Sequence, residues 1–149
     1  MGLYQNRIVV KVGTSTLTNE VGKSDLRSFD QLACVLSDIQ NILPFPPRQY
    51  LRQATTKQDM FCEKYVLHPI KTRPISMRMK QAAAAVGQCS IMFLYDKFFG
   101  DYDKTIAQIL LNAEDIEQEE KKENLTNTFN ALLEMGIIPV VNENDSVSY

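Results

Sequence analysis

The sequence predicts an α/β fold built around a mainly parallel sheet. Three short runs rich in β-branched and apolar residues, Ile8–Val12, Thr105–Leu111 and Ile137–Val141, alternate with longer stretches of helical period. Such alternation is typical of β-α-β units with right-handed crossovers, in which the strands run parallel. The chain has 149 residues, 44% hydrophobic and 23% charged, which suffices for one cored domain of ordinary size.

The first two elements are a strand and a helix. Ile8–Val12 is short and apolar, and the turn-forming run Gly13-Thr14-Ser15 follows it directly. Asp25 can cap a helix that continues to about Gln40. One face of this helix is expected to carry its apolar residues, namely Leu26, Phe29, Leu32, Ala33 and Leu36.

The segment from Asn41 to about Lys71 has no apolar period. Pro44, Pro46 and Pro47 break any regular element, and polar residues follow them. We therefore expect neither a helix nor a strand in this segment.

A long helix is predicted from Met77 to Phe99. The run Ala82–Ala85 favours helix strongly, and Gly100 is a suitable stop. Its apolar bulk is expected from Val86, Met92, Phe93 and Phe99.

The last third of the chain is expected to begin with the strand Thr105–Leu111 and a solvated acidic connection, Asn112–Lys122. A helix then starts at Asn124 or Thr126 and ends at Gly136. Its inward face is predicted to hold Phe129, Leu132, Leu133 and Met135.

Composition argues against several classes of protein. The net charge of −2 and the pI near 5.4 give no electrostatic reason to expect nucleic acid or an anionic membrane as partner. Cys34, Cys62, Cys89 and His68 show no metal-ligand spacing, so neither a metal site nor a disulfide framework is expected. No apolar run is long enough for a membrane span and no signal peptide is apparent, so we expect a cytoplasmic protein.

Two polar clusters follow predicted strands, where ligands bind in parallel sheets. In the first, Lys11 precedes Gly13, Thr14 and Ser15. The lysine can place a positive charge at a phosphate, and the backbone N–H groups after it can line an anion site. The order differs from a Walker A loop, and a surface lysine before a simple turn is the alternative.

The second cluster is Asn142-Glu143-Asn144-Asp145. Carboxylates there could hold the ammonium group of an amino acid, and amides could bind its carboxylate. The alternative is an ordinary polar loop. Four consecutive residues cannot all point inward, so we predict no metal site here.

Five segments in this order resemble those of the glutamate 5-kinases, within the amino acid kinase family. They are Val9–Ser15, Lys80–Gln88, Ala107–Leu111, Asn127–Leu133 and Ile138–Asp145. The resemblance implies a three-layer α/β/α sandwich that uses ATP with Mg²⁺ to convert L-glutamate to glutamyl 5-phosphate, on the way to proline.

The resemblance also assigns roles to residues. Lys11 matches the catalytic lysine that contacts the ATP phosphates and the transferring group, and Asn142 and Asp145 match glutamate-binding positions. A fixed cation beside the phosphates suits phosphoryl transfer, which needs alignment and charge neutralisation. We thus expect a nucleotide site at Lys11, Gly13, Thr14 and Ser15, and a substrate site at Asn142 and Asp145.

The sequence departs from the family in two places. The family continues beyond the position of Tyr149 with a further substrate loop and a nucleotide-binding half. We therefore expect residues 1–149 to be the amino-terminal, glutamate-binding portion of an incomplete kinase domain, inactive alone and able to form a homo-oligomer. Another amino acid kinase, acting on acetylglutamate, aspartate or carbamate, and a non-catalytic fragment are the alternatives.

The second departure is the proline-broken segment 41–71. The family has a strand there, which ends in a Val-Ser-Ser-Gly-Ala loop. Read one base out of frame, the codons for Pro44–Ala54 permit a similar Val-Ser-Ser run, so we predict two compensating frame changes in the gene or its sequencing. The alternative is a divergent insertion that folds differently.

Overall fold

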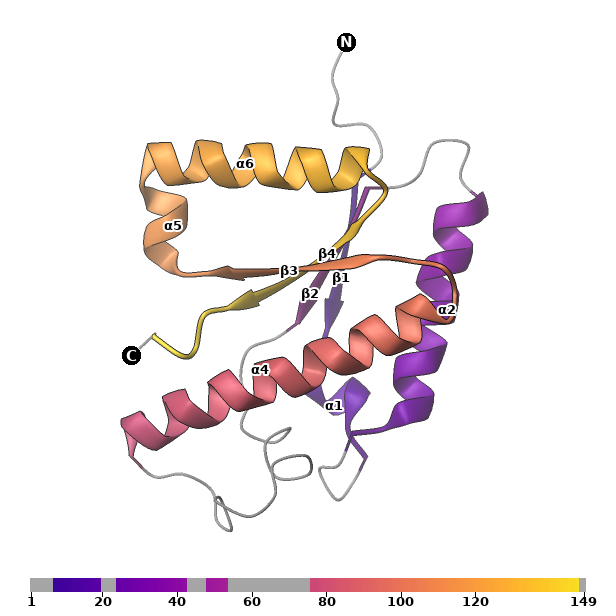
Figure 1. Cartoon of the computed structure of the whole chain (residues 1–149), viewed down its shortest axis with the longest axis horizontal. Coiled ribbons are helices and arrows are strands. Elements are labelled where there is room, and N and C mark those ends of the chain that lie inside the picture. Colours follow the sequence, from indigo (N-terminus) through magenta and orange to yellow (C-terminus); the bar gives the residue numbers. More distant parts are fainter. Residues whose placement is uncertain (1–6, 20–23, 43–47, 54–75, 148–149) are drawn as a thin grey trace.

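The computed structural model describes residues 7–19, 24–42, 48–53 and 76–147, which form a mixed α/β structure around a small parallel sheet (Figure 1). The strands are β1 (Arg7–Val12), β2 (Arg48–Gln53), β3 (Ile106–Leu111) and β4 (Ile138–Glu143). The helices are α1 (Thr14–Leu17), α2 (Leu26–Ile42), α4 (Met77–Gly100), α5 (Ala113–Glu117) and α6 (Glu119–Glu134).

The sheet has the order β1-β2-β4-β3, and every pairing is parallel. β1 pairs with β2, and β3 with β4, along their whole length. β2 and β4 pair at Leu51↔Val140 and Arg52↔Val141. All four carboxyl ends therefore lie at one edge of the sheet, and the two polar clusters predicted above share that edge.

The strand β2 corrects the expectation that segment 41–71 lacks regular structure. Its residues, Arg48–Gln53, come after Pro47 and include no proline. Their backbone N–H groups are therefore available to the ladder, and β2 occupies a central position between β1 and β4. Residues 41–42 end α2, whereas residues 43–47 and 54–71 lie outside the described residues. The frame changes in the gene stay a prediction.

Strand alternation assigns the two faces of the sheet. Val12 and Val140 point toward α2 and α4, where they join the core. Arg7 lies on the opposite face, where its Nη2 donates to Asn130 Oδ1 of α6 at 2.7 Å. Figure 1 shows α4 and α6 on opposite sides of β3.

The core lies between α2, α4 and the sheet. Tyr95 and Phe29 pack edge to face, with ring centroids 5.2 Å apart, and burial raises the pKa of the Tyr95 hydroxyl above its ordinary value. The buried cluster contains Val12, Leu17, Phe29, Ala33, Leu36, Ile91, Leu94, Tyr95, Phe99, Ile138 and Val140.

Two residues expected to supply apolar bulk are exposed. Phe93 is 63% exposed on the outer side of α4, and Met135 is 64% exposed at the end of α6. Met135 is the C-cap, beside the turn at Gly136 with its φ of 73°, so its side chain has left the inward face of the helix.

The two longest helices begin with side-chain caps, of which the one at Asp25 was predicted and the one at Ser76 was not. Asp25 accepts hydrogen bonds from the Arg27 N–H at 3.1 Å and from the Ser28 hydroxyl at 2.9 Å, ahead of α2. Ser76 caps α4 by accepting from the Met79 N–H. These bonds satisfy backbone donors that a helix start leaves free, which explains why both helices begin close to the predicted positions.

The acidic stretch 112–122 was expected to be a connection, and this is wrong. It contains α5 and the first turn of α6. Asp115 accepts from the Asn112 N–H at 2.9 Å, and Glu119 and Glu120 lie at the positive end of α6. Acidic residues at helix starts and the good helix formers Glu and Lys stabilise helix here without an apolar face.

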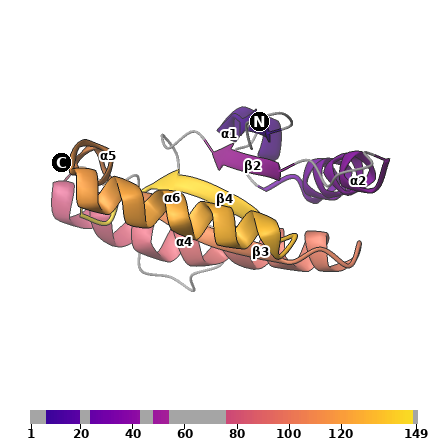
Figure 2. The ribbon, with the colours of Figure 1, turned by 90° about the horizontal axis from the view of Figure 1, so that it is seen from above.

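Seen from above, β1, β2, α1 and α2 form one row, and the elements from α4 onward form a second row beside it (Figure 2). Besides the β2–β4 pairing and the Arg7–Asn130 bond, further hydrogen bonds join the two rows. The Tyr102 hydroxyl donates to Asp30 Oδ1 at 2.9 Å, Lys104 Nζ to Asn41 Oδ1 at 2.7 Å and Gln40 Nε2 to the Gly136 carbonyl at 3.2 Å. Among the described helices, none combines the length and the apolar character that a membrane span requires.

Candidate functional site

Asn142 lies inside a strand, whereas the sequence suggested a loop after Val141. β4 continues to Glu143, and the Asn142 side chain is 3% exposed on the face covered by α4. Its Nδ2 donates to Gln88 Oε1 of α4 at 3.1 Å. Its Oδ1 is buried, and no described residue donates to it.

The chain after β4 forms a tight turn that places Asp145. The Asn144 N–H donates to the Leu111 carbonyl of β3 at 3.0 Å, and the Val147 N–H donates to the Asn144 carbonyl at 3.1 Å. The Ser146 hydroxyl donates to Asn144 Oδ1 at 2.5 Å. Both backbone and side-chain bonds thus fix the acidic turn against the end of the sheet.

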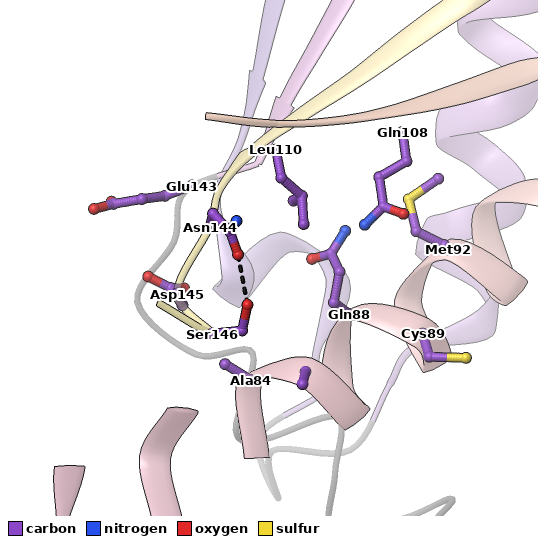
Figure 3. A pocket seen from close by; sticks show the side chains of 11 residues that line it. Ala84, Gln88, Cys89, Met92, Gln108, Leu110, Glu143, Asn144, Asp145 and Ser146 are labelled. Carbon is purple, nitrogen blue, oxygen red and sulfur yellow. Dashed lines mark hydrogen bonds between the residues drawn. The ribbon is translucent and has the colours of Figure 1, made fainter. Parts of the chain in front are cut away.

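A pocket of about 390 Å³ lies between this turn, β3 and α4 (Figure 3). Its acidic lining residues are Glu143, whose side chain points away from the other lining residues in Figure 3, and Asp145, and no described lining residue is Lys or Arg. A concave site with this charge favours a cationic group such as an ammonium. The lining residues are Ala84, Ala85, Gln88, Cys89, Met92, Gln108, Leu110, Glu143, Asn144, Asp145 and Ser146.

Helix α4 forms one wall of the pocket. Ala83, Ala84 and Gly87 are buried, so the small residues let the helix approach the sheet closely. Nothing in the sequence pattern assigned chemistry to Gln88 or Gln108, which add amide groups to the lining. A usable signal was present in Gln88, which lies on the helix face that buries Ala84 and Ile91, where a polar residue needs a partner.

Lys11 lies at the same edge of the sheet but outside the described lining of the pocket. It is exposed, and it pairs in register with Arg52, which pairs with Val141. Two strand spacings therefore separate the backbones of Lys11 and Val141, roughly 10 Å. Strand alternation directs Lys11 to the face of Arg7, away from α4, so it can approach the pocket only over the carboxyl edge.

Gly13 has a backbone conformation that any residue can adopt, with φ −76° and ψ 150°. A Cβ at this position would meet Ser15 Oγ and Thr16 Oγ1 at 3.8 Å, which is ordinary contact. The fold itself therefore does not require glycine here. Ser15 is exposed in the short helix α1, and the Thr14 side chain lies outside the described residues.

The described residues include no group of three or more His, Cys, Asp or Glu side chains that could hold a metal ion. Glu143 and Asp145 are the two carboxylates of the pocket. Any Mg²⁺ at this edge would consequently need most of its ligands from phosphates and water, which is how this ion is commonly bound.

Comparison with known proteins relates this geometry to a family. The profile of the amino acid kinase family matches residues 6–148. Over 142 residues, 95% of the chain, it is 46% identical to a glutamate 5-kinase of Clostridium perfringens, 42% to one of Listeria innocua and 41% to one of Enterococcus faecalis. These matches cover 49–50% of each relative, so the chain spans about half the length of the curated relatives it matches. The chain belongs to the amino acid kinase family.

Proposed function

We propose that this chain is the glutamate-binding portion of a cytoplasmic glutamate 5-kinase with a three-layer α/β/α sandwich. The reaction transfers the γ-phosphoryl group of ATP to the side-chain carboxylate of L-glutamate, which gives glutamyl 5-phosphate, the first step of proline biosynthesis. Support comes from the relatives, each of which bears the name glutamate 5-kinase.

The observation that carries the proposal is the acidic pocket at the carboxyl edge of a parallel sheet. Asp145 lines it, on a turn fixed to β3, and can pair with the α-ammonium of an amino acid. Asn142 adds a buried carbonyl oxygen close by, and the amide of Gln108 can donate to a carboxylate.

Lys11 is proposed to act from β1, two strands away from β4 in the sheet. A lysine side chain extends far enough beyond the edge to approach a phosphoryl group between β1 and the pocket. In the transfer, a carboxylate oxygen of glutamate forms the new P–O bond while the bond to the β-phosphate breaks. A fixed cation beside the transferring group stabilises its negative charge.

The end of β1 is compatible with ATP phosphates. Lys11 is exposed, and Gly13 leaves open the space that a Cβ would fill. The backbone of Gly13, Thr14 and Ser15 could then lie close to a phosphate. Mg²⁺ would be held mainly by the phosphates, since no described cluster of acidic side chains supplies a protein site.

Calorimetric titration with L-glutamate tests the proposal. Asp145→Asn removes the charge that pairs with the ammonium, so the Kd for glutamate should rise about 10- to 100-fold. Asp96→Asn, on the exposed side of α4, is the matched control and should leave the Kd unchanged.

A panel of N-acetylglutamate, aspartate and carbamate separates the related kinases. N-acetylglutamate has no ammonium group and should bind weakly. Binding of N-acetylglutamate in preference to glutamate, or full glutamate affinity in Asp145→Asn, would contradict the assignment.

A further inference from the structure

Gln88 and Asn142 form a buried polar pair where α4 meets the end of β4. Their exposed fractions are 7% and 3%, and the Asn142 Nδ2 donates to Gln88 Oε1 at 3.1 Å. An amide that has lost its water needs such a partner. The pair links a residue of the pocket wall, Gln88, to one that lies just behind it.

This hydrogen bond fixes the orientation of the Asn142 amide. The amide has a donor end and an acceptor end, and Gln88 takes the donor end. The acceptor, Oδ1, is buried, and none of the described residues donates to it. A buried acceptor without a donor is unfavourable, so we expect a bound ligand to supply the donor.

The position of Asn142 relates this acceptor to the pocket. Its hydrogen-bond partner Gln88, its register neighbour Leu110 on β3 and the next residue, Glu143, all line the pocket (Figure 3). Asn142 itself is not a lining residue, and its buried acceptor lies directly behind three residues that are.

We propose that Gln88 is a positioning residue, which holds the Asn142 amide so that its carbonyl oxygen accepts from the ammonium group of glutamate. The inference rests on the proposed function, since it assumes that glutamate occupies this pocket. Without Gln88 the amide could turn its NH₂ group toward the ammonium, where two donors would face each other. Gln88 would thus select for an amino acid over the same dicarboxylate without an amino group.

The test is titration of the full chain with L-glutamate and with glutarate, which has no amino group. Gln88→Met keeps the length of the side chain and removes the acceptor. It should raise the Kd for glutamate about 10- to 100-fold and leave the Kd for glutarate unchanged. Gln88→Glu keeps an acceptor for Asn142 and should restore binding of glutamate.

Asn142→Asp provides a second variant, in case Gln88→Met fails to fold. It keeps an acceptor for the ammonium, so glutamate binding should persist while glutarate binding weakens. Circular-dichroism melts of every variant report on the fold.

The titrations of these variants test the role of Gln88 separately from the proposed function. Equal weakening of both ligands in Gln88→Met, unchanged glutamate binding there, or loss of glutamate binding in Asn142→Asp would overturn the role of Gln88. If the unaltered chain binds glutamate and Asp145→Asn weakens it, such results leave the proposed function intact. If the unaltered chain does not bind glutamate, both proposals fail.

Discussion

The ends of β4 and β1 lie at the same edge of the sheet but are built differently. At the end of β4, Asn142 is buried and bonded to Gln88, and the following turn is tied to Leu111. At the end of β1, Lys11 and Ser15 are exposed, and a four-residue helix follows. Hydrogen bonds within the protein organise the first end, whereas the side chains of the second end are exposed.

The position of each strand in the sheet accounts for this difference. β4 lies between β2 and β3 and has α4 on one face, so polar groups at its end must find partners within the protein. β1 is paired on one side only within the described sheet. An exposed lysine there keeps its hydration and needs no partner within the protein, which is compatible with the role proposed for Lys11.

The largest effect on stability should come from a core residue of α4, the helix that covers the end of β4. Ile91 is 0% exposed in the core beneath the pocket, and Ile91→Ala should lower the free energy of unfolding by about 2–5 kcal/mol. Val9→Ala, on a β1 residue that is 63% exposed, should change it by less than about 0.5 kcal/mol. Urea denaturation measures the free energy of unfolding of both variants. If both variants lower it equally, the side chains of β1 contribute as much packing energy as those of α4, and the contrast between the two ends is wrong.

The next largest effect should distinguish phosphoryl transfer at the end of β1 from glutamate binding at the end of β4. Lys11→Ala should lower phosphoryl transfer about 100- to 1000-fold while the Kd for glutamate stays constant. The assay uses a fusion of this chain to the half of the Clostridium perfringens glutamate 5-kinase that the chain does not match. Turnover is measured as the glutamyl hydroxamate that this fusion forms. Lys80→Ala, at the exposed start of α4, is the control. A Lys11 variant that loses glutamate binding as well would place this lysine in the substrate pocket.

The sequence predicted the elements that local signals define. Asp25 specified the start of α2, and short apolar runs rich in β-branched residues specified β1, β3 and β4. The strand β2 was missed because its residues, Arg48–Gln53, carry no apolar period and follow three prolines, so pairing with neighbours decides it. Helices α5 and α6 extended into the acidic stretch because caps and charges stabilise them where apolar period is absent.

The site was predictable to a similar degree. The sequence indicated Asp145, and the described pocket includes it; the roles assigned to it and to Lys11 stay predictions. It could not indicate that strand alternation directs Lys11 away from α4, because that depends on which face the helix covers. Gln88 was missed since a glutamine within a small-residue helix gains its significance from Asn142, 54 residues later in the chain.

The smallest effect on stability, and the sharpest test of the β1 end, is Gly13→Ala. The backbone of Gly13 suits alanine, although glycine is the better N-cap, so the free energy of unfolding should change by less than about 1 kcal/mol in either direction. ATP affinity should nevertheless fall about 10-fold, because the new methyl group occupies the space in which a phosphate would approach the backbone. Gly100→Ala, where an added Cβ meets nothing within 4 Å at the end of α4, is the matched control and should leave ATP binding unaltered. Urea denaturation and titration with ATP measure the two quantities separately. If Gly13→Ala binds ATP as tightly as the unaltered chain, the end of β1 does not receive a phosphate, and the open space beside Lys11 needs another explanation.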